Sequence, residues 1–268
     1  MSIYSYSLQG RRPSNEDQHT SILNINNNIE KYASVNYFGV YDGHGGKLVS
    51  KFLKNNLHKY FTSKKNQNIM EMNNKNISEY IYKVFNKVEN KLEKEHPIAV
   101  NHCGSTAVSV LNYKDKNNDN VLWVMNVGDS RALMCNYQDK PIQLSFDHKP
   151  NVKNERERIL GLGGKPSFDG LDWRISGLSL SRSFGDLDAR PYITHKPEIH
   201  KYKINKTDKF LVLACDGLWD VLSNQIVVKY INNLKNKNFK GNYSKSLAEY
   251  AYKKGSYDNI SVLVYFFN

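Results

Sequence analysis

Short apolar runs alternate with longer amphipathic stretches along this chain. Runs of about four to eight residues that are rich in Val and aromatic residues, and that end at Gly or polar residues, are typical of buried strands. Such runs predict strands at residues 3–9, 19–26, 33–41, 106–112, 121–127, 131–137, 173–180, 209–215 and 260–267. The polar segment 114–120 predicts a turn between two of these strands.

Apolar residues spaced three and four positions apart mark the expected helices. This spacing predicts helices at residues 47–61, 77–92, 151–160, 224–234 and 243–253. Pro97 stands just past the end of the second predicted helix, and Gly161 directly follows the third, which is typical of helix ends. The polar segment 62–75 is expected to be a loop.

The order of these elements indicates the fold class. Consecutive strands are too numerous for a doubly wound parallel sheet, in which strands and helices alternate. Runs of strands together with pairs of helices instead indicate an α+β fold, with antiparallel sheets and helices on their outer faces. The 268 residues are enough for one large core, and neither an internal repeat nor a long linker divides them. We therefore expect one domain over residues 1–268.

Three of the predicted strands end at an Asp beside a Gly. The junctions are Asp42-Gly43, Gly128-Asp129 and Asp216-Gly217. An acid at the end of a buried strand needs a cation or a cap, because Asp is rarely fully buried without a partner. A single Asp-Gly junction is commonly only a turn. Three such junctions indicate that the acids collect around a hard cation.

Other short polar motifs add acids to this set, namely Glu16, Asp17, Asp220 and Asp258. Carboxylate oxygens suit Mg²⁺ and Mn²⁺, whereas His and Cys are too sparse in these motifs for zinc. The carbonyl of Gly43 offers one more oxygen. A carboxylate that bridges two such ions would hold them roughly 3.5–4 Å apart, with an activated water between them.

Several of these residues also have purely structural interpretations. Glu16 and Asp17 alone could be a solvated pair, and Arg182 and Asp186 could form an ion pair within one loop. Trp219 is expected in the core. His44 differs, because it lies in Asp-Gly-His-Gly-Gly, where the glycines leave little for a side chain to pack against. We interpret His44 as catalytic.

The formal net charge is +12, from 38 Lys and Arg against 26 Asp and Glu. Attraction to an acidic partner, such as nucleic acid, a membrane surface or phosphorylated protein, is one explanation. General solubility is the other, and we favour it because the lysines are spread along the chain without a basic motif of RNA-binding type. We expect no nucleic-acid partner.

Cysteine spacing and apolar stretches bear on the compartment. The three cysteines are far apart and lack zinc-type spacing, which indicates buried thiols in a reducing compartment. No apolar stretch approaches the ~18 residues of a transmembrane helix, and the first residues lack the charged and apolar segments of a signal peptide. We expect a cytoplasmic protein without a membrane anchor, with the nucleus as the alternative location.

Seven motifs follow one another between Arg12 and Val264. They are Arg-x-x-x-Glu-Asp, Asp-Gly-His-Gly-Gly, Gly-Ser-Thr-Ala, Gly-Asp-Ser-Arg, Ser-Arg-Ser-Phe-Gly-Asp, Cys-Asp-Gly-Leu-Trp-Asp and Asp-Asn-Ile-Ser-Val. In this order they closely resemble the metal-dependent protein phosphatase family, the type 2C serine/threonine phosphatases. Ser183-Phe184, where many members have a small residue, is a mild difference.

The resemblance implies a fold and a reaction. The fold would be a four-layer αββα sandwich, in which two antiparallel sheets are flanked by pairs of helices. Two Mn²⁺ or Mg²⁺ ions would sit in a cleft at one end. A water activated between them would hydrolyse phosphoserine and phosphothreonine in protein substrates. The protein would be a monomer or a weak dimer.

The resemblance also implies ligands for the two ions. Asp42 would bridge them, the Gly43 carbonyl would bind one, and Asp216 and Asp258 would bind the other. The acids that match a weaker third metal site in some members are Asp129 and Asp220.

The remaining roles concern the substrate and water. Glu16 and Asp17 would hold metal-bound waters. Arg12 would bind the substrate phosphate, a task suited to a guanidinium, and His44 would protonate the departing Ser or Thr oxygen. Residues 151–186 would contain a flap that shapes substrate access.

Three other functions remain as alternatives. A non-catalytic member of the family could act as a scaffold, although such a protein has no chemical reason to keep Asp42, Asp216, Asp258, Arg12 and His44. A basic nucleic-acid-binding protein would need clustered Lys and Arg, which the sequence lacks. A metal-dependent hydrolase of small phosphoesters or phosphoanhydrides is opposed only by the family resemblance.

Overall fold

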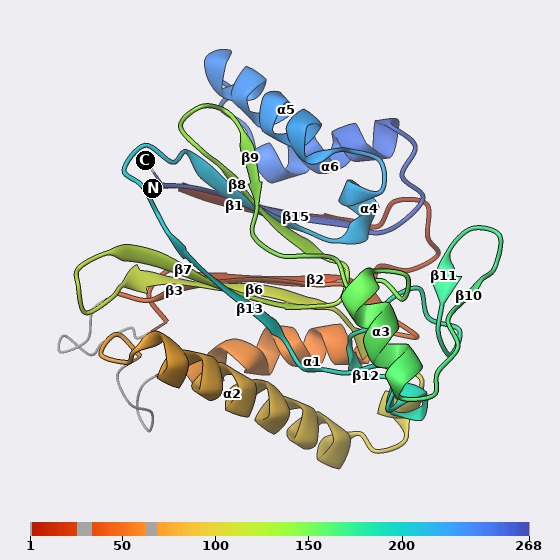
Figure 1. Cartoon of the computed structure of the whole chain (residues 1–268). Coiled ribbons are helices and arrows are strands. Elements are labelled where there is room, and N and C mark those ends of the chain that lie inside the picture. The colour runs from red at the N-terminus through yellow and green to blue at the C-terminus, as the bar shows by residue number, and fades with distance from the viewer. Residues whose placement is uncertain (1, 26–33, 63–68, 268) are drawn as a thin grey trace.

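The computed structural model describes residues 2–25, 34–62 and 69–267, and its elements form four layers (Figure 1). Two five-stranded antiparallel sheets lie face to face, and helices cover the outer face of each sheet. This architecture confirms the predicted α+β fold, a β-sandwich flanked by helices. Within the described ranges, no helix is both long and apolar enough to cross a bilayer.

The first sheet contains both ends of the described chain. Its order is β1 (Ser2–Leu8), β15 (Ile260–Phe266), β14 (Phe210–Ala214), β8 (Arg131–Cys135) and β9 (Pro141–Gln143). Strands β1 and β15 pair along their whole length, from Ser2 opposite Phe266 to Leu8 opposite Ile260. The helices α4 (Asp216–Trp219), α5 (Asn224–Asn236) and α6 (Tyr243–Lys253) lie on its outer side (Figure 1).

The second sheet is built from the first half of the chain and one later strand. Its order is β13 (Glu198–Lys203), β7 (Asn120–Val127), β6 (Ala107–Lys114), β3 (Asn36–Tyr41) and β2 (Gln18–Ile22). The helices α1 (Leu48–Asn56) and α2 (Asn74–Glu95) cover its outer face, with the 3₁₀ helix η1 (Leu57–Phe61) between them in the chain.

Alternate residues of each strand enter different layers of the core, because successive side chains point to opposite faces of a sheet. In β3, Phe38 and Val40 pack between the two sheets, whereas Tyr37 and Tyr41 pack under α1 and α2. A third cluster joins the first sheet to α5 and α6. Strands buried on both faces are almost continuously apolar, which is why the sequence marks them clearly.

Short elements gather at one end of the sandwich. A three-stranded sheet there has the order β12 (Phe184–Gly185), β5 (Gly104–Ser105) and β4 (Gly43–His44). Beside it in Figure 1 lie α3 (Lys153–Gly161) and a hairpin of β10 (Ser167–Phe168) and β11 (Trp173–Arg174). Two 3₁₀ turns complete the elements, η2 (Ala99–Asn101) and η3 (Leu187–Ala189).

The structure differs from the sequence prediction in several elements. The strand expected at 173–180 is limited to β11, because a turn with positive φ at Ser176 and Gly177 follows it. The helix expected at 47–61 changes to 3₁₀ geometry at η1. Strands β9 and β13 were not predicted. Parts of the predictions at 19–26, 33–41 and 62–75 fall on residues 26, 33 and 63–68, which lie outside the described residues.

Candidate active site

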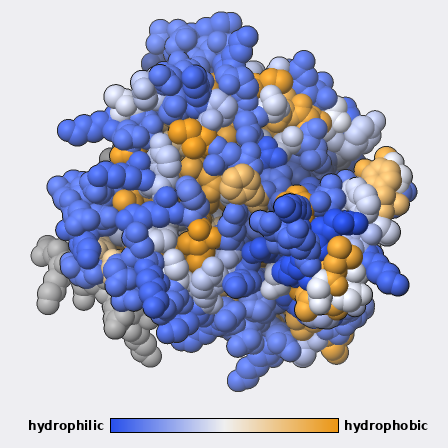
Figure 2. Space-filling model, viewed as in Figure 1, coloured by the Kyte–Doolittle hydropathy of each residue, from blue (hydrophilic) through white to orange (hydrophobic). Residues whose placement is uncertain are grey.

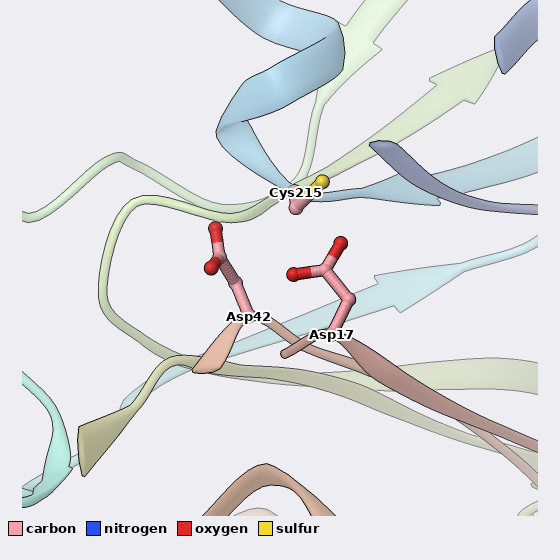
Figure 3. A group of neighbouring side chains, drawn as sticks. All are labelled: Asp17, Asp42 and Cys215. Carbon is pink, nitrogen blue, oxygen red and sulfur yellow. The ribbon is translucent and has the colours of Figure 1, made fainter. Parts of the chain in front are cut away.

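A cavity of about 310 Å³ opens at the end of the sandwich that carries the short sheet of β4, β5 and β12. Eight of the ten residues singled out in the sequence line it: Arg12, Glu16, Asp42, Gly43, His44, Asp129, Asp216 and Asp258. Asp17 is buried beside Asp42 (Figure 3). Asp220, the tenth, is exposed at the end of α4 and does not line the cavity. Residues from both ends and the middle of the chain therefore converge on one site.

Asp42 is held by backbone contacts at the end of β3. Its amide donates to the Thr106 hydroxyl over 3.1 Å, and the Thr106 amide donates to the Asp42 carbonyl over 2.8 Å. The next residue, Gly43, pairs with Ser105 of β5. A Cβ at Gly43 would lie 2.5 Å from the Glu16 carbonyl oxygen, so only glycine fits between these segments. The Asp42 carboxylate thus starts from a rigid backbone.

The acids repel one another inside the cavity. Burial raises the pKa of Asp42 well above its usual range, and the charge of Asp216 raises it further, followed by Asp17. Burial likewise raises the pKa of Asp216, and the next largest cause is the charge of Asp129. Burial raises the pKa of Asp17 to about 6. Ionised carboxylates this close together are unfavourable unless a cation binds among them.

The donor set fits a hard divalent cation. Asp17 and Asp42 come from one side of the site and Cys215 from the other, and one ligand atom of each lies within 4.8 Å of the others (Figure 3). One carboxylate oxygen of Asp17, Oδ2, is buried without a hydrogen-bond partner in the structure. The other acids that line the cavity offer only carboxylate oxygens as further ligand atoms. Oxygen-rich, negatively charged sites suit Mg²⁺ or Mn²⁺.

Cys215 was not expected at this site, and its own contacts indicate a structural role. Its thiol donates to the Asn259 carbonyl over 3.3 Å and accepts the Ser261 amide over 3.1 Å. Burial raises the pKa of Cys215 well above its usual range, and Asp17 and Asp42 add to the rise. The thiol therefore stays protonated and neutral beside the acids. All three cysteines are buried and free, as predicted.

Lys149 is a further residue that sequence analysis missed. Its Nζ lies 2.5 Å from Asp129 Oδ2, and the Asp129 side chain is almost fully buried. Burial works against the charge of Lys149, but Asp129 and Asp216 outweigh it and raise the Lys149 pKa. Asp129, a match to third-metal ligands, is thus already paired with a cation of this chain. Asp220 remains exposed nearby.

Arg12 crosses the mouth of the cavity to Asp258. The distance from Arg12 Nη2 to Asp258 Oδ2 is 2.6 Å, and the Arg12 side chain is 58% exposed. The hydrogen bond that Arg12 donates to Asp258 is the main cause that raises the pKa of Arg12. Because most of the guanidinium faces solvent, a phosphate group can reach it from outside.

Glu16 accepts hydrogen bonds from three nearby residues. Glu16 Oε2 accepts the Gly46 amide over 3.0 Å, and Oε1 accepts the Ser14 hydroxyl over 3.2 Å. The Glu16 carbonyl also accepts the hydroxyl of Ser50 in α1. Glu16 therefore ties the Arg12–Asp17 segment to the loop that follows His44, and its carboxylate still borders the cavity.

His44 is paired with Asp186, which lies 142 residues away in the sequence. The distance from His44 Nε2 to Asp186 Oδ2 is 2.7 Å, and Asp186 is buried. A Cβ at Gly104, between them on β5, would lie 2.1 Å from Asp186 Oδ2 and 2.5 Å from His44 Nε2. Burial alone would lower the pKa of His44, but the hydrogen bond and charge of Asp186 outweigh it and raise that pKa.

The loop ion pair that the sequence suggested between Arg182 and Asp186 is wrong. Asp186 instead meets His44, and Arg182 Nη2 lies 2.5 Å from Glu155 Oε1 on α3. Glu155 also accepts Arg158 Nη2 over 2.9 Å and the Ser181 hydroxyl over 2.8 Å. One buried carboxylate thus joins α3 to the segment that leads into β12.

The segment expected to form a flap contributes to the cavity wall. Arg174, the last residue of β11, lines it together with Leu178, Ser179 and Leu180, which follow the β10–β11 hairpin. Phe168 and Leu171 of the hairpin are exposed. Figure 2 shows a face on which hydrophilic residues predominate and hydrophobic residues form small separate groups, some of them in the region of α3 and this hairpin.

Glu155→Gln should lower the free energy of unfolding by about 3 kcal/mol at pH 7, because it leaves two partly buried arginines without their anion. Burial would raise the pKa of Glu155, but Arg182 outweighs it and holds that pKa at about 2, against 4.5 for a free Glu. The stabilisation is therefore complete above pH 4.5 and is lost as the pH falls toward 2. Thermal melts of both proteins across this range measure it.

The matched control is Glu157→Gln, an exposed position on the same helix. It should change stability by less than about 0.5 kcal/mol. Equal melting of the Glu155→Gln variant and the wild type at pH 7 would contradict the proposed anchoring of α3.

Comparisons with known proteins agree with this architecture. A family model described as Protein phosphatase 2C matches residues 2–260. "Probable protein phosphatase 2C 59" of Arabidopsis thaliana is 37% identical over 99% of this chain and 80% of its own length. "Probable protein phosphatase 2C 11" of the same plant is 36% identical over 97% of this chain, which spans 65% of that relative.

One solved structure shows the shared fold. The serine-threonine phosphatase 2C from Toxoplasma gondii has a TM-score of 0.80 with this chain, over 99% of this chain and 94% of the other. The sequence identity is 21%, so this likeness concerns the fold alone.

Proposed function

The chain belongs to the protein phosphatase 2C family, and on this premise we propose that it is a metal-dependent hydrolase of phosphoserine and phosphothreonine in proteins. The observation that carries the proposal is a single cavity that combines several acids with Arg12 and His44. We propose that residues 1–268 act as one catalytic domain, because β1 and β15 pair and both ends of the chain supply cavity residues.

We propose two Mn²⁺ or Mg²⁺ ions as cofactors. Asp42 and the Gly43 carbonyl would hold one, and Asp42 with Asp216 and Asp258 would hold the other. Bound there, the ions would supply an activated water and offset negative charge on the phosphate. The convergence of carboxylates with raised pKa and the unpartnered Asp17 oxygen support this assignment.

The residues of the chain bind and orient the substrate. Arg12 would exchange its contact with Asp258 for oxygens of the phosphate, to which a guanidinium can donate two parallel hydrogen bonds. Asp17 and Glu16 would orient water. Because Lys149 neutralises Asp129, one of the acids of the wall adds little repulsion against an incoming phosphate.

His44 would donate a proton to the leaving oxygen of the Ser or Thr side chain. Its Nε2 is taken by Asp186, so Nδ1 is the ring nitrogen that remains for the substrate. The charge of Asp186 favours the protonated imidazole that this step needs. Asp186 acts only through His44 and is therefore a positioning residue.

The test of the proposed function is the substrate class. With Mn²⁺ present, the protein should release phosphate from phosphothreonine and phosphoserine peptides. Small phosphoanhydrides, such as pyrophosphate, should be turned over at least about 100-fold less efficiently by kcat/KM. Hydrolysis of pyrophosphate without any release from the peptides would show that the protein is a small-molecule hydrolase instead.

A further inference from the structure

Arg11, next to the proposed phosphate ligand, lies over the rings of two tyrosines. Its guanidinium carbon lies 4.9 Å from the ring centroid of Tyr252 and 4.5 Å from that of Tyr257. Tyr252 is at the end of α6, and Tyr257 is 74% exposed in the loop before Asp258. Contacts of this length are favourable cation–π interactions, and two rings fix the plane of the guanidinium.

Arg11 has no acidic partner among the residues that the structure describes. Among residues 2–25, 34–62 and 69–267, no carboxylate oxygen lies within 4.0 Å of its nitrogens, and Arg11 is exposed. Arg12, in contrast, is paired with Asp258. The guanidinium is thus exposed and held by the two rings, so it can bind a carboxylate with little loss of side-chain entropy.

The same two segments carry Arg11 and the catalytic residues. Gly10 has a φ of +67°, and a Cβ there would lie 2.0 Å from the Asp258 carbonyl oxygen. The Asn259 side chain donates to the carbonyls of Gln9 over 2.7 Å and Ser14 over 2.9 Å. These contacts bind the segment around Arg11 to the loop of Asp258, so Arg11 has a defined position relative to the cavity.

The position of Arg11 indicates which part of a peptide substrate it would contact. Neighbouring Cα atoms are about 3.8 Å apart, so Arg11 is one residue away from the proposed phosphate contact. An extended substrate rises about 3.3 Å per residue, so the second and third residues from the phosphorylated one lie about 7 and 10 Å from it, within the combined reach of an Arg side chain and an acidic side chain. A net charge of +12 favours the approach of an acidic segment.

We propose that Arg11, held by Tyr252 and Tyr257, determines substrate specificity by binding an Asp or Glu side chain two or three residues from the phosphorylated Ser or Thr. The inference rests on the proposed phosphatase function and adds a preferred substrate sequence to it. The partner is thus an acidic phosphopeptide segment.

Three phosphothreonine peptides test the proposal. One has only Ala around the phosphothreonine, the second has Glu two and three residues before it, and the third has Glu two and three residues after it. For the wild type, at least one Glu peptide should have a kcat/KM about tenfold above the Ala peptide, mainly through a lower KM. Arg11→Ala should reduce this ratio to about one.

Two further variants test the contribution of a tyrosine ring and that of positive charge elsewhere on the surface. Tyr257→Ala removes one ring and should reduce the ratio partly, whereas Arg156→Ala, an exposed arginine on α3, should leave it unchanged. Equal kcat/KM for all three peptides with the wild type, or an unchanged ratio in Arg11→Ala, would overturn the inference. The proposed function is reported separately, since failure to release phosphate from any of the three peptides would refute phosphatase activity, whereas equal release from all three would refute only the role of Arg11.

Discussion

Asp42→Asn should lower kcat on a phosphothreonine peptide by at least about 10³-fold. The substitution keeps the size of the side chain but removes a negative charge that would help to hold the proposed metal ions. Stabilisation of charge by bound metal is worth several kcal/mol in a transition state, and each 1.4 kcal/mol is tenfold in rate. Phosphate release with saturating Mn²⁺ measures the loss.

Three further measurements accompany this prediction. Asp188→Asn changes an exposed acid in η3 and should retain full activity. Without metal, Asp42→Asn should raise the melting temperature, because it relieves repulsion among acids whose pKa is raised by burial and by one another. With EDTA, the wild type should be as inactive as the variant. Wild-type turnover that persists in EDTA would refute the metal requirement.

His44→Gln should reduce kcat about 10²- to 10³-fold on the phosphothreonine peptide and less than about tenfold on p-nitrophenyl phosphate. A Thr oxygen leaves poorly without a proton, whereas nitrophenolate is a stable anion, so a general acid matters mainly for the peptide. Steady-state kinetics with both substrates at the same Mn²⁺ concentration measure the difference.

Asp186→Asn provides the companion test, because Asp186 holds His44 Nε2. It should show the same substrate pattern with a smaller loss, about tenfold on the peptide. Matching losses on both substrates for His44→Gln would remove the acid role from His44. An Asp186→Asn variant with the wild-type kcat on the peptide would show that the hydrogen bond does not position the imidazole.

The sequence singles out the proposed ligand residues for a physical reason. Asp42 directly follows β3 and Asp216 lies two residues after the end of β14; both strands are buried on both faces and leave a strong apolar signal. The adjacent glycines begin the next elements, Gly43 in β4 and Gly217 in α4. The antiparallel sandwich places these strand ends together, and this step follows from the family resemblance rather than from local sequence.

The pairings within the site could not be predicted. His44 and Asp186 are 142 positions apart, and neither residue carries a local sign of its partner. The contact depends on three two-residue strands, too short to leave any periodicity. Arg182 and Asp186 looked like partners because they are close in sequence, yet they contact residues of other elements. Long-range ion pairs are set by tertiary packing.

Strand β13 was missed because it is an edge strand. Its sequence, Glu-Ile-His-Lys-Tyr-Lys, is mostly polar, and its side chains are exposed or half-buried. Charged side chains commonly protect an edge from pairing with another chain. Strand β9 has only three residues, which is too few for a pattern.

The central claim is that the acids of this cavity jointly bind divalent ions. Calorimetric titration of Mn²⁺ into the metal-free wild type and into Asp42→Asn tests it most directly. The account predicts about two ions per wild-type chain and loss of at least one of them in the variant. Indistinguishable Mn²⁺ binding by the two proteins, or none by the wild type, would contradict it.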